Sequence, residues 1–154
     1  MNARLRFIVT AATIAALYAV ITILFIPFSY GPVQLRFSEI LTVLPFFTPA
    51  AIPGLFVGCI LGNILNPFNP IDIVVGSIAT LLAACLSRIM PKKWLVPLPP
   101  VILNGVFVGT ELHFVAGFPL LLTILSVAIG EAIVCYIGGM MFMLALDKIK
   151  GRLF

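Results

Sequence analysis

Long runs without a charged residue dominate the hydrophobic pattern of this chain. No charged residue lies between Arg6 and Arg36, and none lies from Ile40 to Ile71. A run of about 20 apolar residues is long enough to cross a bilayer as an α-helix, so the first run predicts one membrane span. The second run would form a helix of about 48 Å, too long for a hydrocarbon core of about 30 Å. Its prolines favour a division into two helices.

The whole pattern predicts an all-α membrane protein. Asn66 and Asn69 both precede prolines and predict a turn, and Asp72 stands where it can cap the helix that follows. The second predicted helix is too short to cross the bilayer at a normal tilt, so we expect local thinning or a partial crossing. The six helices of the predicted transmembrane bundle cover residues 5–28, 39–47, 50–64, 72–90, 96–112 and 118–149.

The basic residues mark one side of the membrane. Lys and Arg concentrate in the cytoplasmic loops of membrane proteins. With six spans, eight of the nine Lys and Arg residues lie on one side, and Arg36 alone lies on the other. We therefore expect both termini in the cytoplasm. The eight residues form three clusters: Arg4 and Arg6; Arg88, Lys92 and Lys93; Lys148, Lys150 and Arg152.

Composition excludes several classes of protein. Of the 154 residues, 62% are hydrophobic and 9% are charged, whereas about 25% are charged in an ordinary soluble domain. We expect one integral membrane domain over residues 1–154. The three cysteines lie in apolar stretches, where they are interpreted as packing residues, and there is one histidine. Without a nucleophile–base motif or a Walker lysine, we expect no enzymatic activity, no cofactor and no metal site.

Glu131 gives the sharpest indication of a site. It lies about 20 Å along the sixth predicted helix from Phe118, which places it within the membrane. A carboxylate at that depth costs several kcal/mol unless it is paired or hydrated. It therefore indicates either a ligand site or a structural ion pair with Arg36.

Other polar residues gather in the half of the protein predicted to face outward. Arg36 and Glu39 can bind a ligand or pair with each other at the start of the second helix. Asn63 and Asn104 lie within apolar helices, where an amide either joins helices or contacts a ligand. Glu111 is a weaker candidate at the end of the fifth helix. Together these residues predict a polar cavity that takes its ligand from outside.

The first helix has a face of small residues spaced four apart. Such faces let two helices approach closely within lipid. The spacing fits a contact inside the chain as well as a contact with a partner. The face consists of Ala11, Ala15 and Ala19, with Ala12 and Ala16 beside them.

Five segments, in order over nearly the whole chain, resemble the queuosine-precursor transporter family, QueT. They are YGPVQLRFSEILTVLP (residues 30–45), GCILGN (58–63), DIVVGSIATLL (72–82), LPPVILN (98–104) and GEAIVCYIG (130–138). QueT proteins are substrate-binding (S) components of energy-coupling factor (ECF) transporters in bacterial plasma membranes. The resemblance implies an ECF S-component bundle with its site near the outer face. It also implies a coupling transmembrane subunit and two cytoplasmic ATPase subunits as partners, with the alanine face on the coupling subunit.

The substrate implied by the resemblance is a 7-deazaguanine base, such as the aminomethyl precursor of queuosine. One carboxylate suits the adjacent N–H donors of a guanine-like edge, and a second suits the cationic aminomethyl group. Glu39 and Glu131 are the first candidates, in either order. The loop of residues 28–38, which contains Gly31 and Pro32, is predicted to act as a lid. Further candidates are Asn63, Asn104, Arg36 and Gln34 as donors, Tyr30, Phe37 and Tyr136 for stacking, and Glu111.

Two alternatives remain at the level of sequence. One is an S component for another vitamin or nucleobase. The other is a small structural membrane protein without a ligand, in which Glu131 and Arg36 form a purely structural pair.

Overall fold

A computed structural model describes residues 2–30, 33–64, 66 and 70–153 of the chain. The described part is all-helical, as predicted, and contains no strand. Two stretches, η1 and η2, are 3₁₀-helices, and η3 is a π-helix. The elements are α1 (Ala3–Leu24), α2 (Ile26–Ser29), η1 (Phe37–Phe46), α3 (Ala51–Ile64), α4 (Asp72–Arg88), η2 (Lys93–Leu95), α5 (Leu98–Ala116), α6 (Leu120–Ala132), η3 (Ile133–Gly139) and α7 (Met140–Leu153).

Most of the predicted helices are present near their predicted bounds. α3, α4 and α5 correspond to the third, fourth and fifth predictions, and α6, η3 and α7 follow one another without a break where one long helix was predicted. The first prediction, 5–28, missed a break. α1 ends at Leu24, and α2 then begins with Pro27 in its first turn. Proline is tolerated there because the first backbone N–H groups of a helix have no partner within it.

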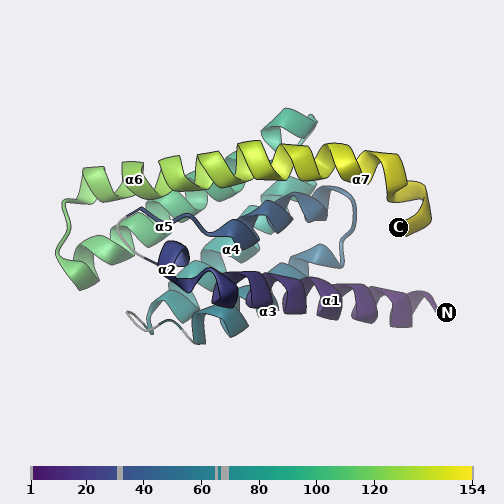
Figure 1. Cartoon of the computed structure of the whole chain (residues 1–154), viewed down its shortest axis with the longest axis horizontal. Coiled ribbons are helices and arrows are strands. Elements are labelled where there is room, and N and C mark those ends of the chain that lie inside the picture. The colour runs from purple at the N-terminus through teal and green to yellow at the C-terminus, as the bar shows by residue number, and fades with distance from the viewer. Residues whose placement is uncertain (1, 31–32, 65, 67–69, 154) are drawn as a thin grey trace.

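The second predicted helix is a 3₁₀-helix rather than an α-helix. At a rise of about 2.0 Å per residue, the ten residues of η1 extend over about 20 Å, whereas ten residues of α-helix would extend over about 15 Å. The tighter winding therefore lengthens the segment that was predicted to be too short. η1 contacts α1, α3, α4, η3 and α7, and Figure 1 shows it between α1 and the α6–α7 run. It is the central element of the bundle.

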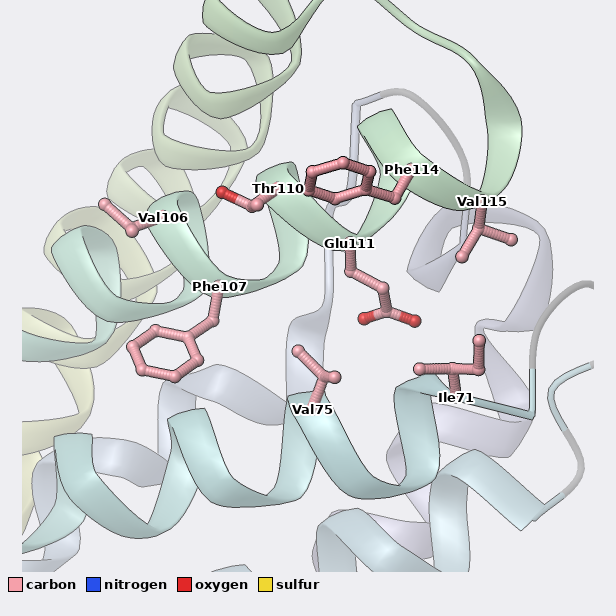
Figure 2. A pocket seen from close by; sticks show the side chains of 8 residues that line it. All are labelled: Ile71, Val75, Val106, Phe107, Thr110, Glu111, Phe114 and Val115. Carbon is pink, nitrogen blue, oxygen red and sulfur yellow. The ribbon is translucent and has the colours of Figure 1, made fainter.

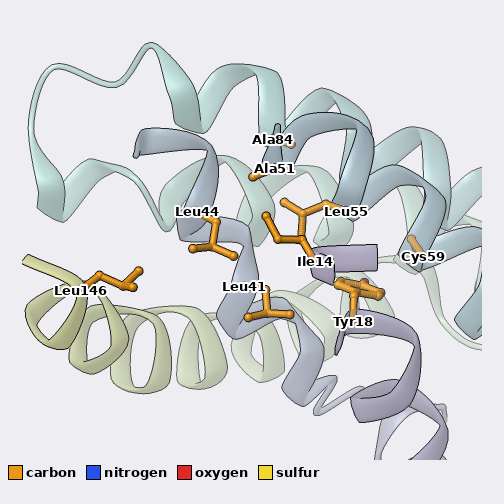
Figure 3. Close-up of a cluster of buried hydrophobic side chains, with 9 residues drawn as sticks. All are labelled: Ile14, Tyr18, Leu41, Leu44, Ala51, Leu55, Cys59, Ala84 and Leu146. Atoms are coloured by element: carbon orange, nitrogen blue, oxygen red, sulfur yellow. The ribbon is translucent and has the colours of Figure 1, made fainter. Parts of the chain in front are cut away.

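An apolar core surrounds η1. It joins side chains from α1, η1, α3, α4 and α7, and Figure 3 shows them converging. Two of its members, Tyr18 and Cys59, also carry a polar group and are fully buried. The polar cluster described below therefore adjoins this core. The core residues are Ile14, Tyr18, Leu41, Leu44, Ala51, Leu55, Cys59, Ala84 and Leu146.

Basic residues from distant parts of the sequence lie at one end of the molecule, which we call the basic end. Lys93 forms an ion pair with Asp147 of α7, and Arg88 donates a hydrogen bond of 2.8 Å to the Pro45 carbonyl at the end of η1. Arg6 lines a pocket of about 270 Å³ with residues 47–50. Both chain ends lie on this side of the molecule (Figure 1).

Three helical segments among the described residues are long and apolar enough to cross a membrane: Ala3–Leu24, Lys93–Ala116 and Leu120–Lys148. Two shorter apolar helices, Phe37–Phe46 and Ala51–Ile64, accompany them. Large apolar side chains cover the outside of α1, with Ile8, Val20 and Leu24 more than half exposed. Such a surface suits contact with lipid. The six-span arrangement stays a prediction.

Glycines at four-residue spacing bring α3 against α1. A Cβ atom at Gly58 would lie 2.7 Å from the Tyr18 Cβ atom and 2.9 Å from the Ala15 carbonyl oxygen, and Gly54 is equally close to the Ala11 carbonyl. The two backbones thus meet directly, as in small-residue contacts between membrane helices. This close approach fixes the position of Tyr18, whose hydroxyl enters the site.

We expect Gly58→Ala to destabilise the fold, because the added methyl group meets backbone atoms that cannot move independently. The cost should be about 1–3 kcal/mol, measurable as a lower midpoint of thermal unfolding in detergent. Gly62→Ala is the matched control on the same face of α3. The three atoms nearest its new Cβ all belong to the Thr22 side chain, the first at 3.1 Å, so its loss should be smaller. Equal losses would mean that the α1–α3 contact is not the rigid one described.

Candidate functional site

Four charged residues lie buried together in the middle of the bundle. Arg36 directly precedes η1, Glu39 lies in the first turn of η1, Asp72 opens α4, and Glu131 lies near the end of α6. Each is at most 2% exposed. Charged groups are costly at such positions and mark functional sites in membrane proteins by default. We call these four residues and their polar neighbours the charged cluster.

Arg36 and Asp72 form the ion pair of this cluster. The Arg36 Nη2 atom lies 2.9 Å from Asp72 Oδ2, which also accepts a hydrogen bond of 3.1 Å from Asn66. From the sequence, Glu39 and Glu131 were possible ion-pair partners of Arg36, as alternatives to a ligand role, and Asp72 was predicted to cap a helix. The structure instead pairs Arg36 with Asp72, so the predicted cap was wrong. The cap position of α4 is Ile71, which makes no side-chain capping bond, and the Asp72 carboxylate is used for Arg36 instead.

Cys59 connects the ion pair to two neighbouring polar residues. Its sulfur accepts hydrogen bonds from Asn63 Nδ2 at 3.5 Å and Thr80 Oγ1 at 3.4 Å, and Arg36 Nη1 lies at 3.9 Å. Asn63 also donates to the Asp72 carbonyl at 2.8 Å. The predicted packing role of this cysteine is therefore incomplete. Its soft sulfur accepts hydrogen bonds that would otherwise be missing inside the bundle.

Glu39 and Glu131 approach each other from η1 and α6. The Tyr18 hydroxyl donates a hydrogen bond to Glu39 Oε1. The Cys135 thiol lies 3.6 Å from Glu131 Oε2 and 3.7 Å from the Glu39 carbonyl. The Asn104 amide interacts with both carboxyl groups. We call Glu39 and Glu131 the carboxyl pair.

Hydrogen bonding around the carboxyl pair is incomplete. Glu39 Oε2 and both polar atoms of the Asn104 side chain lack a hydrogen bond of regular geometry, although Asn104 is only 2% exposed. Buried polar atoms are satisfied in the large majority of cases. Unsatisfied atoms from two elements therefore converge on one place, as expected of a site that reserves hydrogen bonds for a ligand.

Tyr30 borders the charged cluster next to Arg36. Its hydroxyl donates to the Gly62 carbonyl at 3.0 Å and to Asn63 Oδ1 at 3.1 Å. The Arg36 guanidinium carbon lies 5.4 Å from the centre of its ring, within the range of a cation–π contact. Burial raises the pKa of Tyr30 to about 12. The hydroxyl therefore stays protonated and keeps its role as a donor.

The segment of residues 33–36 closes over Glu131. Gln34 is 3% exposed, and a Cβ atom at Gly130 would overlap the Gln34 carbonyl oxygen. The segment thus lies directly on α6 beside the carboxyl pair. The Leu35 amide donates to the Phe28 carbonyl at 2.9 Å, which ties the loop to the end of α2. Gly31 and Pro32 of the predicted lid, and Asn69 of the predicted turn, lie outside the described residues.

Two predicted candidates lie away from this cluster. Glu111 lines a separate pocket between α4 and α5, with a volume of about 470 Å³. Figure 2 shows its carboxylate pointing between Val75 and Ile71. Tyr136 lies on η3 and is half-buried. The structure thus places Glu39, Glu131, Asn104, Arg36, Asn63, Tyr30 and Gln34 together.

Several members of the cluster were not among the predicted site residues: Tyr18, Asp72, Cys59 and Cys135. The position of Tyr18 in the sequence could have indicated its role. It follows Ala11 and Ala15 on the face that packs against α3, where a phenol within an apolar helix must find a partner. Asp72 and the cysteines carried no such signal, because a helix cap and a packing residue explain them equally well.

The structure divides the alanine face of α1. Ala15 and Ala19 are buried, at 6% and 7% exposure, and Ala15 meets Gly58 of α3. Ala11 is half-buried, whereas Ala12 and Ala16 are exposed. Contact within the chain therefore uses one side of this face, and Ala12 and Ala16 remain available to a partner.

Removal of the Asp72 charge should be strongly destabilising. Asp72→Asn leaves the Arg36 guanidinium buried without a counter-charge, and breaking one partner of a buried pair typically costs about 3–5 kcal/mol. Thermal unfolding in detergent measures the loss. Asp147→Asn is the control, because its partner Lys93 has a side chain that is 46% exposed and such pairs contribute about 0–1 kcal/mol. Similar losses in both variants would contradict the central role of the Arg36–Asp72 pair.

Comparison with known proteins identifies the family of the chain. The sequence model described as "QueT transporter" matches residues 8–148. A relative named queuosine precursor transporter QueT, from Lactococcus lactis subsp. cremoris (strain MG1363), is 32% identical, and the match covers 94% of this chain and 92% of the relative. No solved structure matches the chain. The match spans α1 through most of α7, and with its apolar helices the chain is a membrane transport protein that belongs to the QueT transporter family.

Proposed function

We propose that this chain is the substrate-binding subunit of an ECF importer and that it captures a queuosine precursor, a 7-deazaguanine base, from outside the cell. The relative from Lactococcus lactis carries the name of a queuosine precursor transporter, which supports the substrate. The observation that carries the proposal is the carboxyl pair. Glu39 and Glu131 are buried beside Asn104, whose amide has unsatisfied polar atoms.

The chemistry of the ligand fits these groups. A guanine-like edge presents adjacent N–H donors, and one carboxylate can accept two of them. The ring carbonyl needs a donor, which Asn104 supplies. An aminomethyl group is cationic and takes the second carboxylate. Tyr30 and Arg36 border this space, and Gln34 covers it from the loop. Glu111 and Tyr136 are not part of this proposed pose.

Access to the site requires movement. Glu39 and Glu131 are 0% and 2% exposed, so a ligand cannot reach them without displacing neighbouring residues. Residues 33–35 are the candidate for displacement, because Gln34 lies on Gly130, the three residues belong to no helix, and they do not include Arg36 of the ion pair. Loops of this kind open and close over substrates in many proteins.

The proposed topology has six spans, with both termini in the cytoplasm. The basic end supports it, since Arg6, Arg88 and Lys93 gather on one side together with both ends of the chain. That distribution fits the positive-inside rule. Tyr30 and Asn63 then face the outer half, which places the site where a ligand arrives from outside. One integral domain over residues 1–154 performs this binding in a bacterial plasma membrane.

Energy for uptake comes from partners in this proposal. The chain has no Walker lysine motif, so a coupling transmembrane subunit and two cytoplasmic ATPase subunits supply it. Ala12 and Ala16 are exposed on α1. Small exposed side chains on an apolar helix let another membrane helix approach closely, and we assign the contact with the coupling subunit to these two residues.

Glu131→Gln should weaken binding of aminomethyl-7-deazaguanine by about 100-fold or more, because it removes one charge from a buried, charge-assisted contact. Calorimetry on purified protein in detergent measures the affinity. Asp147→Asn is the control, since it removes a carboxylate at the basic end and should leave the affinity unchanged. Unaltered affinity in Glu131→Gln, with normal thermal unfolding, would remove Glu131 from the site.

Ala16→Leu should spare ligand binding and impair transport. A larger side chain on the exposed face separates the two helices, and a loss of about 1.4 kcal/mol in association already lowers complex formation tenfold. Uptake of labelled precursor and co-purification with the coupling subunit measure the effect. Ala145→Leu, at an exposed alanine of α7, is the matched control. Normal uptake in Ala16→Leu would refute the assigned interface.

A further inference from the structure

The charged cluster does not balance its charges. Within the described part of the chain, it combines three carboxyl groups, Glu39, Asp72 and Glu131, with the single guanidinium of Arg36. Arg36 is already committed to Asp72 at 2.9 Å. The carboxyl pair therefore has no cation of its own within hydrogen-bond distance among the described residues. Two ionised carboxylates at that depth would carry two uncompensated negative charges.

Among the described residues, Arg36 is the one positively charged group that acts on the carboxyl pair, and it is paired with Asp72. From α1, Tyr18 donates a hydrogen bond to Glu39. From η3, the Cys135 thiol contacts the Glu131 carboxyl group and the Glu39 backbone carbonyl, and from α3, Cys59 contacts Arg36. From α4, Asp72 adds a further negative charge. Tyr18, Asp72, Cys135 and Arg36 are thus the titratable groups that act on the pair.

Asn104 fits a pair that holds one proton. Its amide acts electrostatically on both carboxyl groups from α5, and neither its Nδ2 nor its Oδ1 atom has a hydrogen-bond partner of regular geometry in the described part of the chain. A side-chain amide has one accepting and one donating end. Two carboxylates can use only the donating end, whereas one carboxylic acid and one carboxylate use both. The amide is therefore complementary to a singly protonated pair.

We propose that Glu39 and Glu131 share one proton while the site is empty, and that a cationic ligand releases this proton to solvent and takes its place. The inference rests on the proposed function, because it concerns the same site and the same class of ligand. Two close carboxyl groups away from water do not both ionise, as in the paired carboxyls of aspartic proteases. Once an ammonium group stands between them, both can ionise.

Proton replacement keeps the charge of the site constant. The empty pair carries one negative charge and one proton. With the ligand bound, two carboxylates carry two negative charges and the ammonium group carries one positive charge, so the sum is unchanged. A neutral base of the same shape binds without this exchange, because nothing replaces the proton. The affinity for a cationic aminomethyl base therefore depends on pH, whereas the affinity for an uncharged base does not.

Calorimetry with two ligands tests the proposal. Aminomethyl-7-deazaguanine is compared with 7-methyl-7-deazaguanine, which has the same ring but no amine, in buffers of different ionisation enthalpy. An alkylamine stays protonated between pH 6 and 8, so any proton released comes from the protein. We expect release of about one proton with the amine and none with the methyl analogue. The affinity for the amine should rise by close to tenfold per pH unit from pH 6 to 7.

The outcomes separate this inference from the proposed function. Binding of the amine without proton release, at an affinity independent of pH, would overturn the inference and leave the proposed function intact. Binding of neither base at any pH would overturn both. Release of a proton with the methyl analogue as well would also overturn it, because the exchange would not depend on the ligand's charge.

Infrared spectroscopy gives a readout that does not depend on affinity. The ligand-free protein should show the carbonyl stretch of a protonated carboxylic acid, and the amine should abolish that band whereas the methyl analogue should preserve it. Asp147→Asn is the control and should behave like the native protein. If saturation with the amine left the carboxylic-acid band unchanged, the proposed exchange would be wrong.

Discussion

The ion pair between Arg36 and Asp72 is the interaction on which the rest of the site depends. A guanidinium inside a membrane bundle costs several kcal/mol unless a carboxylate and hydrogen bonds compensate it. Asp72 supplies the carboxylate at 2.9 Å, and the sulfur of Cys59 accepts on the other side. Because Arg36 directly precedes η1 and Asp72 opens α4, the pair fixes where both elements begin. Glu39 follows Arg36 by three residues, so its position is fixed with them.

Close backbone contacts supply the rigidity that a buried polar cluster requires. Gly58 lets α3 meet α1, which holds Tyr18 in place for Glu39. Gly130 lets the segment of residues 33–36 lie on α6 next to Glu131. A side chain at either glycine would separate the elements, and the hydrogen bonds between them would be lost. The glycines thus contribute to the site without touching a ligand.

Most of the helices and many residues of the candidate site could be predicted from the sequence. The ion-pair partner of Arg36 could not. Long uncharged runs and prolines gave the bounds of α3 and α4 closely. Glu39, Glu131 and Asn104 were predicted in one site because polar groups inside a membrane protein are costly unless they bind a partner or a ligand. The sequence offered two carboxylates for Arg36 and a local role for Asp72, so the true pair was missed. Only the packing of α4 against η1 brings Asp72 to Arg36. The same limit applies to Glu111, whose helix directs it into a different pocket.

The glycine contacts and the Arg36–Asp72 pair together keep the carboxyl pair buried. The helices around the carboxyl pair are held by glycine contacts and by the Arg36–Asp72 pair, so they cannot separate without exposing charge or breaking close packing. Residues 33–35 are held by the contact of the Gln34 carbonyl with Gly130 and by one backbone hydrogen bond from Leu35 to Phe28, whereas Arg36 is anchored by its ion pair with Asp72. Opening at residues 33–35 therefore leaves the Arg36–Asp72 pair in place. Under the proposed function, a ligand entering there would first meet α6 at Gly130, next to Glu131.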